Sequence, residues 1–369
     1  MEYIKLGEIA KIVAGSTAPK ENQFNDSTGL PFIRAGHLEA LCNNYDLNRL
    51  PRVDESNKDI KKQVRVPKNT IVFAKSGMSC MKARVYQTTE ESYIVNHLAG
   101  IICSEKVNPS YLKYYFMINK PNRLVIDESY PSIRLSDISN MNIYIPNLEI
   151  QLKIANILDK ANNLIDKRKE QIESLDELVK SRFIEMFGNV ITNSNAWETE
   201  LLGEICDLKA GKNIKAKDIY ENNSEDLYPC YGGNGLRGYV KNYSHEGNIN
   251  LIGRQGALCG NVKYAKGKFY ATEHAVVTQP KVSINSYWLY YVLTELDLNR
   301  LSTGAAQPGL TVGKLNEVEI PKVPIELQNQ FADFVKQVDK LKFEMEKSLK
   351  ELEDNFNSLM QKAFKGELF

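Results

Sequence analysis

The strongest constraint on the fold of this 369-residue chain is an internal duplication. Leu6-Gly7-Glu8-Ile9 recurs 196 positions later, as residues 202–205. Such a duplication dictates architecture, because both copies are expected to fold alike. Residues 146–188 also match residues 324–366, with identical residues 177 positions apart at Glu149/Glu326, Gln151/Gln328, Ala155/Ala332, Leu175/Leu352, Ser181/Ser358 and Phe187/Phe364. We therefore expect two globular segments, the first about nineteen residues longer, each followed by a matching helix.

The two matching stretches carry a heptad pattern, with spacings that alternate between four and three residues. Such spacing is typical of a coiled-coil seam. The first seam comprises Ile154, Leu158, Ala161, Ile165, Arg168, Ile172, Leu175, Val179, Arg182 and Met186. The second comprises Phe331, Val335, Val338, Lys342, Met345, Leu349, Leu352, Phe356, Leu359 and Ala363. Two helices of this length, each about 60 Å long, are expected to pair with each other rather than lie singly on a domain.

Polar residues interrupt both seams, at Arg168, Arg182 and Lys342. At such positions we expect lower stability and a fixed register. The second globular segment has to connect the end of the first helix to the start of the second, and a domain of its size is about 35–40 Å across. The pair should therefore be antiparallel, with the globular segments at opposite ends and a pseudo-twofold axis across the middle.

The globular segments combine short strands with short helices, which indicates an α+β fold. Strands are expected at residues 70–73, 142–145 and 250–252, where β-branched or alternating runs stand beside turns that contain glycine. Short helices are expected over residues 108–118 and 286–296. The fold class is thus two mixed, strand-rich domains joined by a long antiparallel helix pair.

Composition and motifs argue against several classes of protein. No run of eighteen apolar residues occurs, and the first residues resemble neither a signal nor a transit peptide, so we expect a cytosolic chain without a membrane anchor. Six scattered cysteines and four histidines lack the spacing of a zinc site or a disulfide framework. No phosphate-binding loop, dinucleotide fingerprint or nucleophile elbow is present.

The near-neutral charge conceals differences between segments. The chain has 47 Lys and Arg against 46 Asp and Glu. Residues 1–147 carry a net charge of +4, residues 189–325 carry 0, and the two helices together carry −3. Because affinity for nucleic acid depends on cations that meet phosphates, such a chain should bind DNA weakly alone and depend on partner subunits.

A turn that follows a strand recurs in both globular segments, at residues 73–77 and 252–256. Each turn offers a cation, a polar side chain and a glycine, and further basic or polar residues follow. Arg and Gln suit base edges, whereas Lys suits phosphate. An ordinary exposed hairpin turn is the alternative interpretation. The candidate DNA-binding residues are Lys75, Ser76, Lys82 and Arg84 in the first segment and Arg237, Arg254, Gln255 and Lys263 in the second.

Two further stretches of the second segment are rich in glycine, at residues 231–239 and 304–309. Glycine lets a backbone approach a ligand closely, and it also makes loops flexible. Tyrosines are interleaved with the first stretch and could stack on bases, although half-buried strand tyrosines are the commoner explanation. These are Tyr228, Tyr231, Tyr239 and Tyr243.

In these features the chain resembles the specificity (S) subunits of type I restriction-modification enzymes, the HsdS family. The resemblance rests on KLGEI at residues 5–9 and its copy, YPCYGGNG at 228–235, LIGRQG at 251–256, FYATEHA at 269–275, and the helix starts at Pro146 and Pro324. It covers essentially the whole chain. The first globular segment departs more, with PSIRL at residues 131–135 where the second has PGLT at 308–311.

The resemblance implies target-recognition domains at residues 1–147 and 189–325 and spacer helices at 148–188 and 326–369. Each domain would read one half of an asymmetric bipartite site on double-stranded DNA, and the helices would set the spacer and dock methyltransferase subunits. Nuclease/translocase subunits would complete the complex. The chain would have no catalytic residues, metal or cofactor of its own, because S-adenosylmethionine, ATP and magnesium would belong to the partner subunits.

Two other functions compete with this interpretation. One is a coiled-coil scaffold that binds only proteins, which accounts for the helices but not for duplicated domains with polar glycine turns. The other is a specificity subunit of a related methylation-only or type II system. Salt-dependent DNA binding distinguishes a DNA reader from a scaffold, because phosphate contacts make affinity fall steeply with salt.

Overall fold

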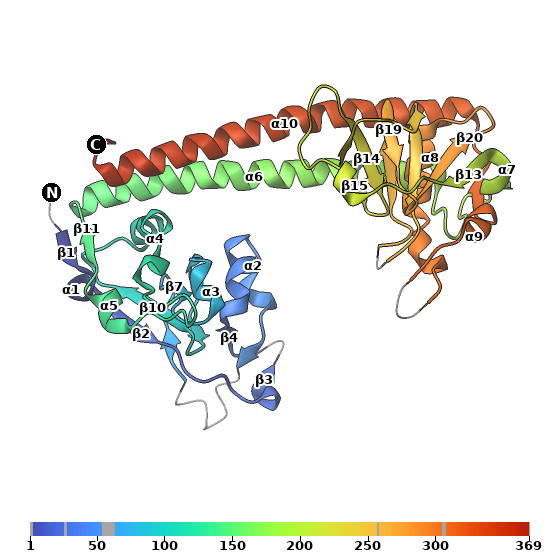
Figure 1. The fold of residues 1–369 in the computed structure, drawn as a ribbon. Coiled ribbons are helices and arrows are strands. Elements are labelled where there is room, and N and C mark those ends of the chain that lie inside the picture. The colour runs from blue at the N-terminus through green and yellow to red at the C-terminus, as the bar shows by residue number, and fades with distance from the viewer. Residues whose placement is uncertain (1–2, 26–27, 54–62, 257, 305–307, 369) are drawn as a thin grey trace. The chain divides into compact units, whose positions relative to one another are not determined.

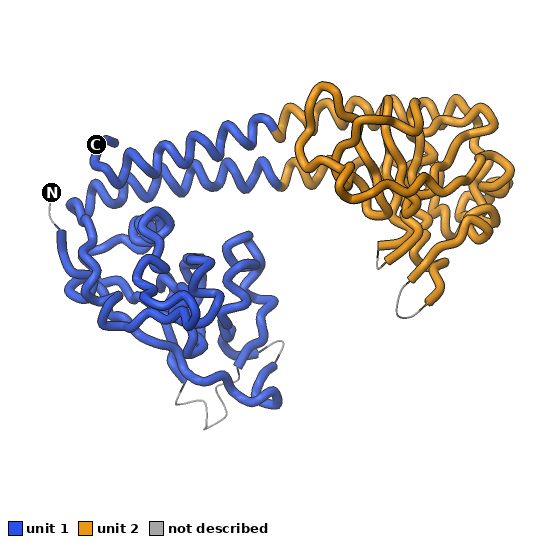
Figure 2. The backbone as a smooth tube through the Cα atoms, viewed as in Figure 1, with its two compact units in different colours: residues 1–169, 347–369 blue, residues 170–346 orange. Residues whose placement is uncertain are grey.

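The computed structural model describes residues 3–25, 28–53, 63–256, 258–304 and 308–368. They fold into two compact units (Figure 2). Unit 1 comprises residues 1–169 and 347–369, and unit 2 comprises residues 170–346. This division cuts each of the two long helices, so both units contain part of each helix. Among the described residues, no helix combines the length and the apolar character needed to cross a membrane.

The described residues of unit 1 form three sheets, with short helices between their strands (Figure 1). A four-stranded antiparallel sheet has the order β2-β10-β7-β8, a five-stranded mixed sheet has the order β3-β5-β4-β9-β6, and β1 pairs with β11. The elements are β1 (Tyr3–Lys5), α1 (Leu6–Ile9), β2 (Ala10–Ala14), β3 (Phe24–Asn25), β4 (Leu30–Ile33), α2 (Leu38–Cys42), β5 (Arg52–Val53), β6 (Arg65–Val66), β7 (Ile71–Ala74), α3 (Met78–Met81), β8 (Val85–Gln87), β9 (Ser92–Ile94), β10 (Leu98–Cys103), α4 (Pro109–Ile118), α5 (Leu135–Ser139) and β11 (Asn142–Tyr144).

Three sheets are also present in the described part of unit 2. The orders are β13-β20-β17-β18, antiparallel throughout, then β15-β14-β19-β16, with β14 and β19 parallel, and β12-β21. The elements are β12 (Thr199–Leu201), α7 (Leu202–Ile205), β13 (Cys206–Ala210), β14 (Tyr228–Gly232), β15 (Gly235–Val240), β16 (His245–Glu246), β17 (Ile249–Gly253), β18 (Val262–Ala265), β19 (Lys268–Ala271), β20 (Ala275–Pro280), α8 (Ser286–Glu295), α9 (Val312–Asn316) and β21 (Glu319–Pro321).

The mixed helix and strand content predicted from the sequence is confirmed. The expected strands are β7, β11 and β17, and the expected short helices are α4 and α8. Strands β7 and β17 are buried at every position, and each has a paired strand on both sides in its sheet. Strand β7 is a continuous apolar run, whereas β17 includes the buried Asn250, whose side-chain amide donates to Ser286 O at 2.9 Å. The domain boundaries 1–147, 148–188, 189–325 and 326–369 stay a prediction.

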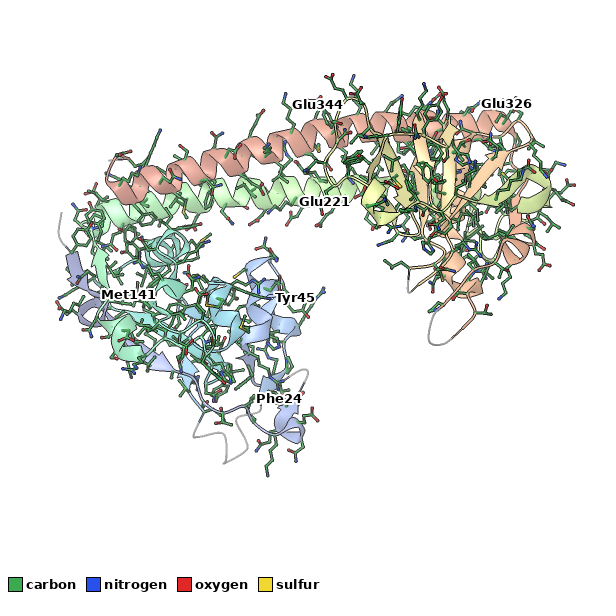
Figure 3. The ribbon with its side chains drawn as sticks, in the orientation of Figure 1. Phe24, Tyr45, Met141, Glu221, Glu326 and Glu344 are labelled. Carbon is green, nitrogen blue, oxygen red and sulfur yellow. The ribbon has the colours of Figure 1, made fainter. Side chains whose placement is uncertain are left out.

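Two long helices, α6 (Leu148–Phe187) and α10 (Ile325–Lys365), run antiparallel within each unit (Figure 1). In unit 2, Phe331 near the start of α10 meets Phe183 near the end of α6, with ring centroids 5.4 Å apart. In unit 1, Lys169 Nζ lies 3.5 Å from Glu353 Oε1. Every residue of the two predicted seams is buried or half-buried. Glu326 and Glu344, labelled in Figure 3, are exposed on α10.

Lys342 shows how the helix pair accommodates a polar seam residue. Its Nζ lies 2.6 and 2.7 Å from the two carboxylate oxygens of Asp176 on α6. The lysine side chain is 29% exposed, so its apolar stem packs in the seam while the ammonium reaches the surface. A cation at this seam position is therefore paired with an acid from the facing helix.

A buried glutamine ties the start of each long helix to the globular part of its unit. Gln151 Oε1 accepts a hydrogen bond of 2.8 Å from the Asn108 N–H, at the start of α4. Gln328 Oε1 accepts one of the same length from the Asn285 N–H, at the start of α8. The Gln151 amide also donates to Pro146 O, and that of Gln328 donates to Val323 O. The glutamines shared by the two matching stretches thus connect two helix starts.

Candidate nucleic-acid interface

The turn after β17 is held from two sides in unit 2. The Arg254 N–H donates to His274 O at 3.0 Å, and the Leu310 N–H donates to Arg254 O at 2.8 Å. Gln255 forms an isolated bridge with Gly309. Backbone hydrogen bonds in both directions fix the path of the turn, so its side chains project from a defined frame.

Close backbone packing brings the glycine-rich hairpin against this turn. A Cβ on Gly253 would lie 1.9 Å from Gly233 O, so the end of β17 approaches the β14–β15 hairpin more closely than any side chain permits. A hollow of about 490 Å³ opens where they meet. It is lined by the hairpin residues 232–236 together with Arg237, Gln255, Gly256 and His274.

The structure brings Arg237 and Gln255 together at this hollow, and both side chains are exposed. Burial raises the pKa of the neighbouring Cys230 thiol to about 11, while Arg237 lowers that pKa and Glu273 raises it. The charges of Arg237 and Glu273 therefore both act on the Cys230 thiol. The exposed Arg237 and Gln255 side chains beside the glycine-rich hairpin can form hydrogen bonds with the edge of a base.

The other two predicted residues of unit 2 are half-buried. Among the described residues, no hydrogen-bond partner reaches the buried Arg254 Nε, Thr272 Oγ1 or Glu273 Oε2. Lys263 packs its stem against the hairpin, because a Cβ on Gly235 would lie 3.1 Å from its Cε. Buried polar atoms without partners are rare in proteins and call for a ligand, an ion or water.

The equivalent turn in unit 1 follows β7 and also contacts a histidine. The Lys75 N–H donates to His97 O at 2.8 Å, and Ser76 Oγ lies 2.8 Å from His97 Nδ1. Gly77 has a φ of 75° and open space where a Cβ would stand. Ser76 also forms an isolated bridge with Ser132. Lys75 and Ser76 thus lie together on a turn fixed by hydrogen bonds.

Lys82 and Arg84 engage different partners from Lys75 and Ser76. Arg84 Nη2 lies 2.5 Å and Lys82 Nζ 4.0 Å from the Glu39 carboxylate on α2. Both residues line a separate cavity of about 600 Å³ in unit 1. The sequence assigned all four residues to the turn after β7 and the segment that follows it. In the structure, helix α3 separates Lys82 and Arg84 from that turn.

The two glycine-rich stretches differ in how much of them is described. Ala305 to Gln307 lie outside the described residues, while Gly309 pairs with Thr303 in an isolated bridge. The strand tyrosines Tyr228, Tyr231 and Tyr239 are half-buried, as the commoner explanation holds, and Tyr243 is 43% exposed. Within the described ranges, no three His, Cys, Asp or Glu side chains are grouped to hold a metal ion.

Sequence reasoning overlooked three of the cations that line the cavity beside Arg84. Lys113 lies on α4, Lys68 precedes β7 and Lys120 follows α4. These lysines are far apart in the sequence and belong to no motif. Only the packing of α4 against β8 brings them to one place, so no local signal could have identified them.

The family described as Type I restriction modification DNA specificity domain matches residues 1–175 and 194–354. The type I restriction enzyme EcoprrI specificity subunit of Escherichia coli is 51% identical over 141 residues, which are 38% of this chain and 35% of that protein. The MjaIX specificity subunit of Methanocaldococcus jannaschii is 31% identical over 164 residues, 42% of this chain and 36% of its own length. The matches thus span about a third of each relative.

The fold is similar to that of a solved structure. The crystal structure of a type I restriction-modification system S subunit from M. genitalium superimposes with a TM-score of 0.64. It covers 98% of this chain and 96% of the M. genitalium chain at 19% sequence identity. Because the family match extends over most of the sequence, the chain belongs to the type I restriction modification DNA specificity domain family.

Proposed function

We propose that the chain is the DNA-specificity subunit of a type I restriction-modification complex, in which each globular segment reads one half of an asymmetric bipartite site. The observation that carries this proposal is the hollow of unit 2. There Arg237 and Gln255 stand exposed beside an open glycine hairpin and a fixed turn. Donors and acceptors that are held rigidly but remain open to solvent suit the readout of base edges in a groove.

The eight residues predicted from the sequence remain our proposed DNA contacts. In unit 2, Arg237, Gln255 and the half-buried Arg254 would meet bases, and Lys263 would meet phosphate. In unit 1, Lys75 and Ser76 would occupy the matching turn, while Lys82 and Arg84 would meet phosphates from the adjoining cavity. The comparison of Lys75 and Ser76 with Arg254 and Gln255 supports different sequences for the two half-sites, because the side chains differ.

The chain itself would catalyse no reaction. Its long helices would dock methyltransferase subunits, nuclease/translocase subunits would join them, and S-adenosylmethionine, ATP and magnesium would bind to those partners. The relatives named above are specificity subunits, which supports this assignment. The cytosolic location stays a prediction.

An internal pseudo-twofold repeat would relate the two halves of the chain and place the globular segments at opposite ends of an antiparallel coiled coil. Two observations support it. The four-stranded sheets β2-β10-β7-β8 and β13-β20-β17-β18 follow the chain in the same order. Each long helix begins with a buried glutamine bound to the N-cap asparagine of a short helix. The length of the helix pair would then set the gap between the half-sites.

Binding to a library of random DNA duplexes tests the proposal, with and without the methyltransferase partner. We expect affinity to fall steeply with salt and sequencing of the bound fraction to yield two conserved blocks separated by a constant gap. Arg254→Ala should relax one base position in one block at a cost of about 1–3 kcal/mol. The exposed Lys217→Ala change, away from the hollow, is the control. Salt-independent binding without enrichment would instead identify a protein scaffold.

A further inference from the structure

A second cavity lies wholly within unit 1, and it extends beyond Lys82 and Arg84 to residues that the DNA-reading proposal does not use. It has a volume of about 600 Å³ and opens between the segment 82–89, helix α4 and helix α6. Asp159 and Asn162 contribute the α6 side, and Ser110, Lys113 and Tyr114 contribute the α4 side. We call this cavity the basic pocket.

The lining of the basic pocket has an excess of positive charge. Five cationic residues line it, and among its described lining residues Asp159 is the acid. Glu39 adds a second carboxylate through its ion pairs with Lys82 and Arg84. Asp166 adds a third carboxylate, because it is hydrogen-bonded to Asn162 and raises the pKa of Lys113, so the local net charge is +2. The five cationic residues are Lys68, Lys82, Arg84, Lys113 and Lys120.

Lys113 is half-buried, whereas the other three lysines of the basic pocket are exposed. Its Nζ lies 3.6 Å from Asp159 Oδ1 and 4.2 Å from the centroid of the Tyr114 ring. Asp159 Oδ1 also accepts a hydrogen bond of 2.7 Å from Tyr114 Oη. Burial lowers the pKa of Lys113, and Asp159 raises it. One carboxylate oxygen is thus shared between a lysine and a tyrosine.

Arg84 also lines the basic pocket, from the segment between α3 and β8. Burial raises the pKa of the Cys42 thiol, and both Arg84 and Lys113 lower it, so both cations act on one sulfur atom that lines the pocket. Cys42 Sγ itself donates to Val85 O at 3.4 Å. A guanidinium and an ammonium therefore converge from two different elements on the same cavity.

Convergent cations repel one another unless an anion lies between them. Phosphate suits such a site, because an Arg fork binds two of its oxygens and lysines add point charges. We propose that the basic pocket of unit 1 binds a phosphate group, either from the backbone of a DNA duplex or from a free phosphate compound. In the first case the inference rests on the proposed function, and in the second case it is independent of it.

The full chain is used for the test, with Lys68→Ala/Lys120→Ala as the pocket variant. Both lysines are exposed, and neither forms an ion pair with another residue of the described chain, so the fold should be retained. Lys11→Ala/Lys106→Ala is the control, because it removes two exposed lysines of unit 1 that do not line the pocket. Glu39→Gln is a third variant, which leaves Lys82 and Arg84 without their carboxylate.

Inorganic phosphate and a random-sequence duplex are the two probes. If the source is free phosphate, calorimetric titration should show binding that the pocket variant loses, the control keeps and Glu39→Gln strengthens. If the source is the duplex, the affinity of the pocket variant should depend less on salt. The slope of log affinity against log salt should become less negative by about 2, while base discrimination is unchanged. The inference is overturned if both probes bind the pocket variant and the control alike, or if neither probe binds the unaltered chain.

The two proposals fail in different ways. If the chain binds inorganic phosphate in this pocket but binds no duplex, the proposal for the basic pocket stands and the DNA-reading function is contradicted. If the unaltered chain selects a duplex sequence, and the pocket variant and the control have the same salt slope, the DNA-reading function stands and phosphate binding in the basic pocket is contradicted.

Discussion

At residue scale, Gly253 is the position where the candidate interface depends most directly on the absence of a side chain. The nearest atom to a Cβ there would be a backbone oxygen, Gly233 O, at 1.9 Å. Backbone cannot rotate away as a side chain can. We predict that Gly253→Ala destabilises the chain by about 1–3 kcal/mol, in the range of overpacked cores, and disturbs the hairpin beside Arg237.

Urea unfolding measures this change, and Gly313→Ala is the matched control in unit 2. A Cβ on Gly313 would lie 3.9 Å from its nearest neighbour, Thr311 Oγ1, and the residue belongs to α9, so alanine should be neutral or stabilising there. Equal unfolding free energies for Gly253→Ala and the unaltered chain would contradict the close packing of β17 on the hairpin.

The raised pKa values of three cysteine thiols predict how the free energy of unfolding depends on pH. Burial raises the pKa of Cys103 and of Cys206 from 9.0 to about 12, and that of Cys230 to about 11. Above pH 9 the unfolded chain can ionise these thiols and the folded chain cannot. Since the folded pKa values are raised, their stabilising contribution is full below pH 9 and is lost as the pH rises toward 12.

The free energy of unfolding should therefore fall as the pH rises from 9 toward about 12, as followed by urea titration. Replacing Cys103 and Cys206 by alanine should make that fall shallower. An unchanged dependence on pH in this variant would show that the two thiols do not titrate on unfolding.

Residue identities at the candidate site could be predicted only in part. Arg254, Gln255 and His274 belong to the motifs at residues 251–256 and 269–275. The structure brings Gln255 to the hollow with Arg237. Lys113 could not be found, because its place beside Arg84 depends on how α4 packs on β8. Motifs record neighbours in sequence, whereas the basic pocket is assembled from distant elements.

At the scale of elements, the buried glutamines join each long helix to the rest of its unit. Gln328 is 5% exposed, and its side chain satisfies the Asn285 N–H and Val323 O. Leucine at this position would leave both groups buried without partners, at about 1–3 kcal/mol each. We predict that Gln328→Leu lowers the free energy of unfolding by about 3 kcal/mol.

Thermal or urea unfolding compares this variant with Gln330→Leu, which changes the same residue type at an exposed position of α10. The control should be close to neutral, because surface substitutions usually stay within about 0.5 kcal/mol. If both changes had the same effect, the hydrogen bonds of Gln328 would not hold the helix start.

The long helices and central strands were predictable because their patterns are strong and local. Ten seam positions in each long helix repeat at heptad spacing, and β7 is a continuous apolar run. The five-stranded sheet was not predicted, because β3, β5 and β6 have only two residues each and their order β3-β5-β4-β9-β6 brings together distant segments. Short strands of this kind depend on tertiary pairing rather than on a periodic pattern.

At the scale of the whole molecule, the helix pair would act as the spacer between half-sites. Removing one heptad from both α6 and α10 keeps the seam in phase and shortens the pair by about 10 Å. We predict that the gap in the recognised site shortens by about three base pairs, at 3.4 Å for each base pair. Removing one heptad from a single helix is the control, because it breaks the pairing of the seams.

Methylation mapping reads out the spacer of the heptad variant directly. An unchanged gap would mean that something other than the helix pair sets the distance between half-sites. The single-helix deletion should instead abolish methylation, since its two seams can no longer match along their length.

The most direct test of the central claim is single-molecule methylome sequencing of cells that carry the complete system, with and without this chain. We predict one asymmetric motif of two blocks separated by a constant gap, methylated only when the chain is present. Methylation that persists without the chain, or that follows a single continuous motif, would contradict the account of one DNA-reading domain in each half of the molecule.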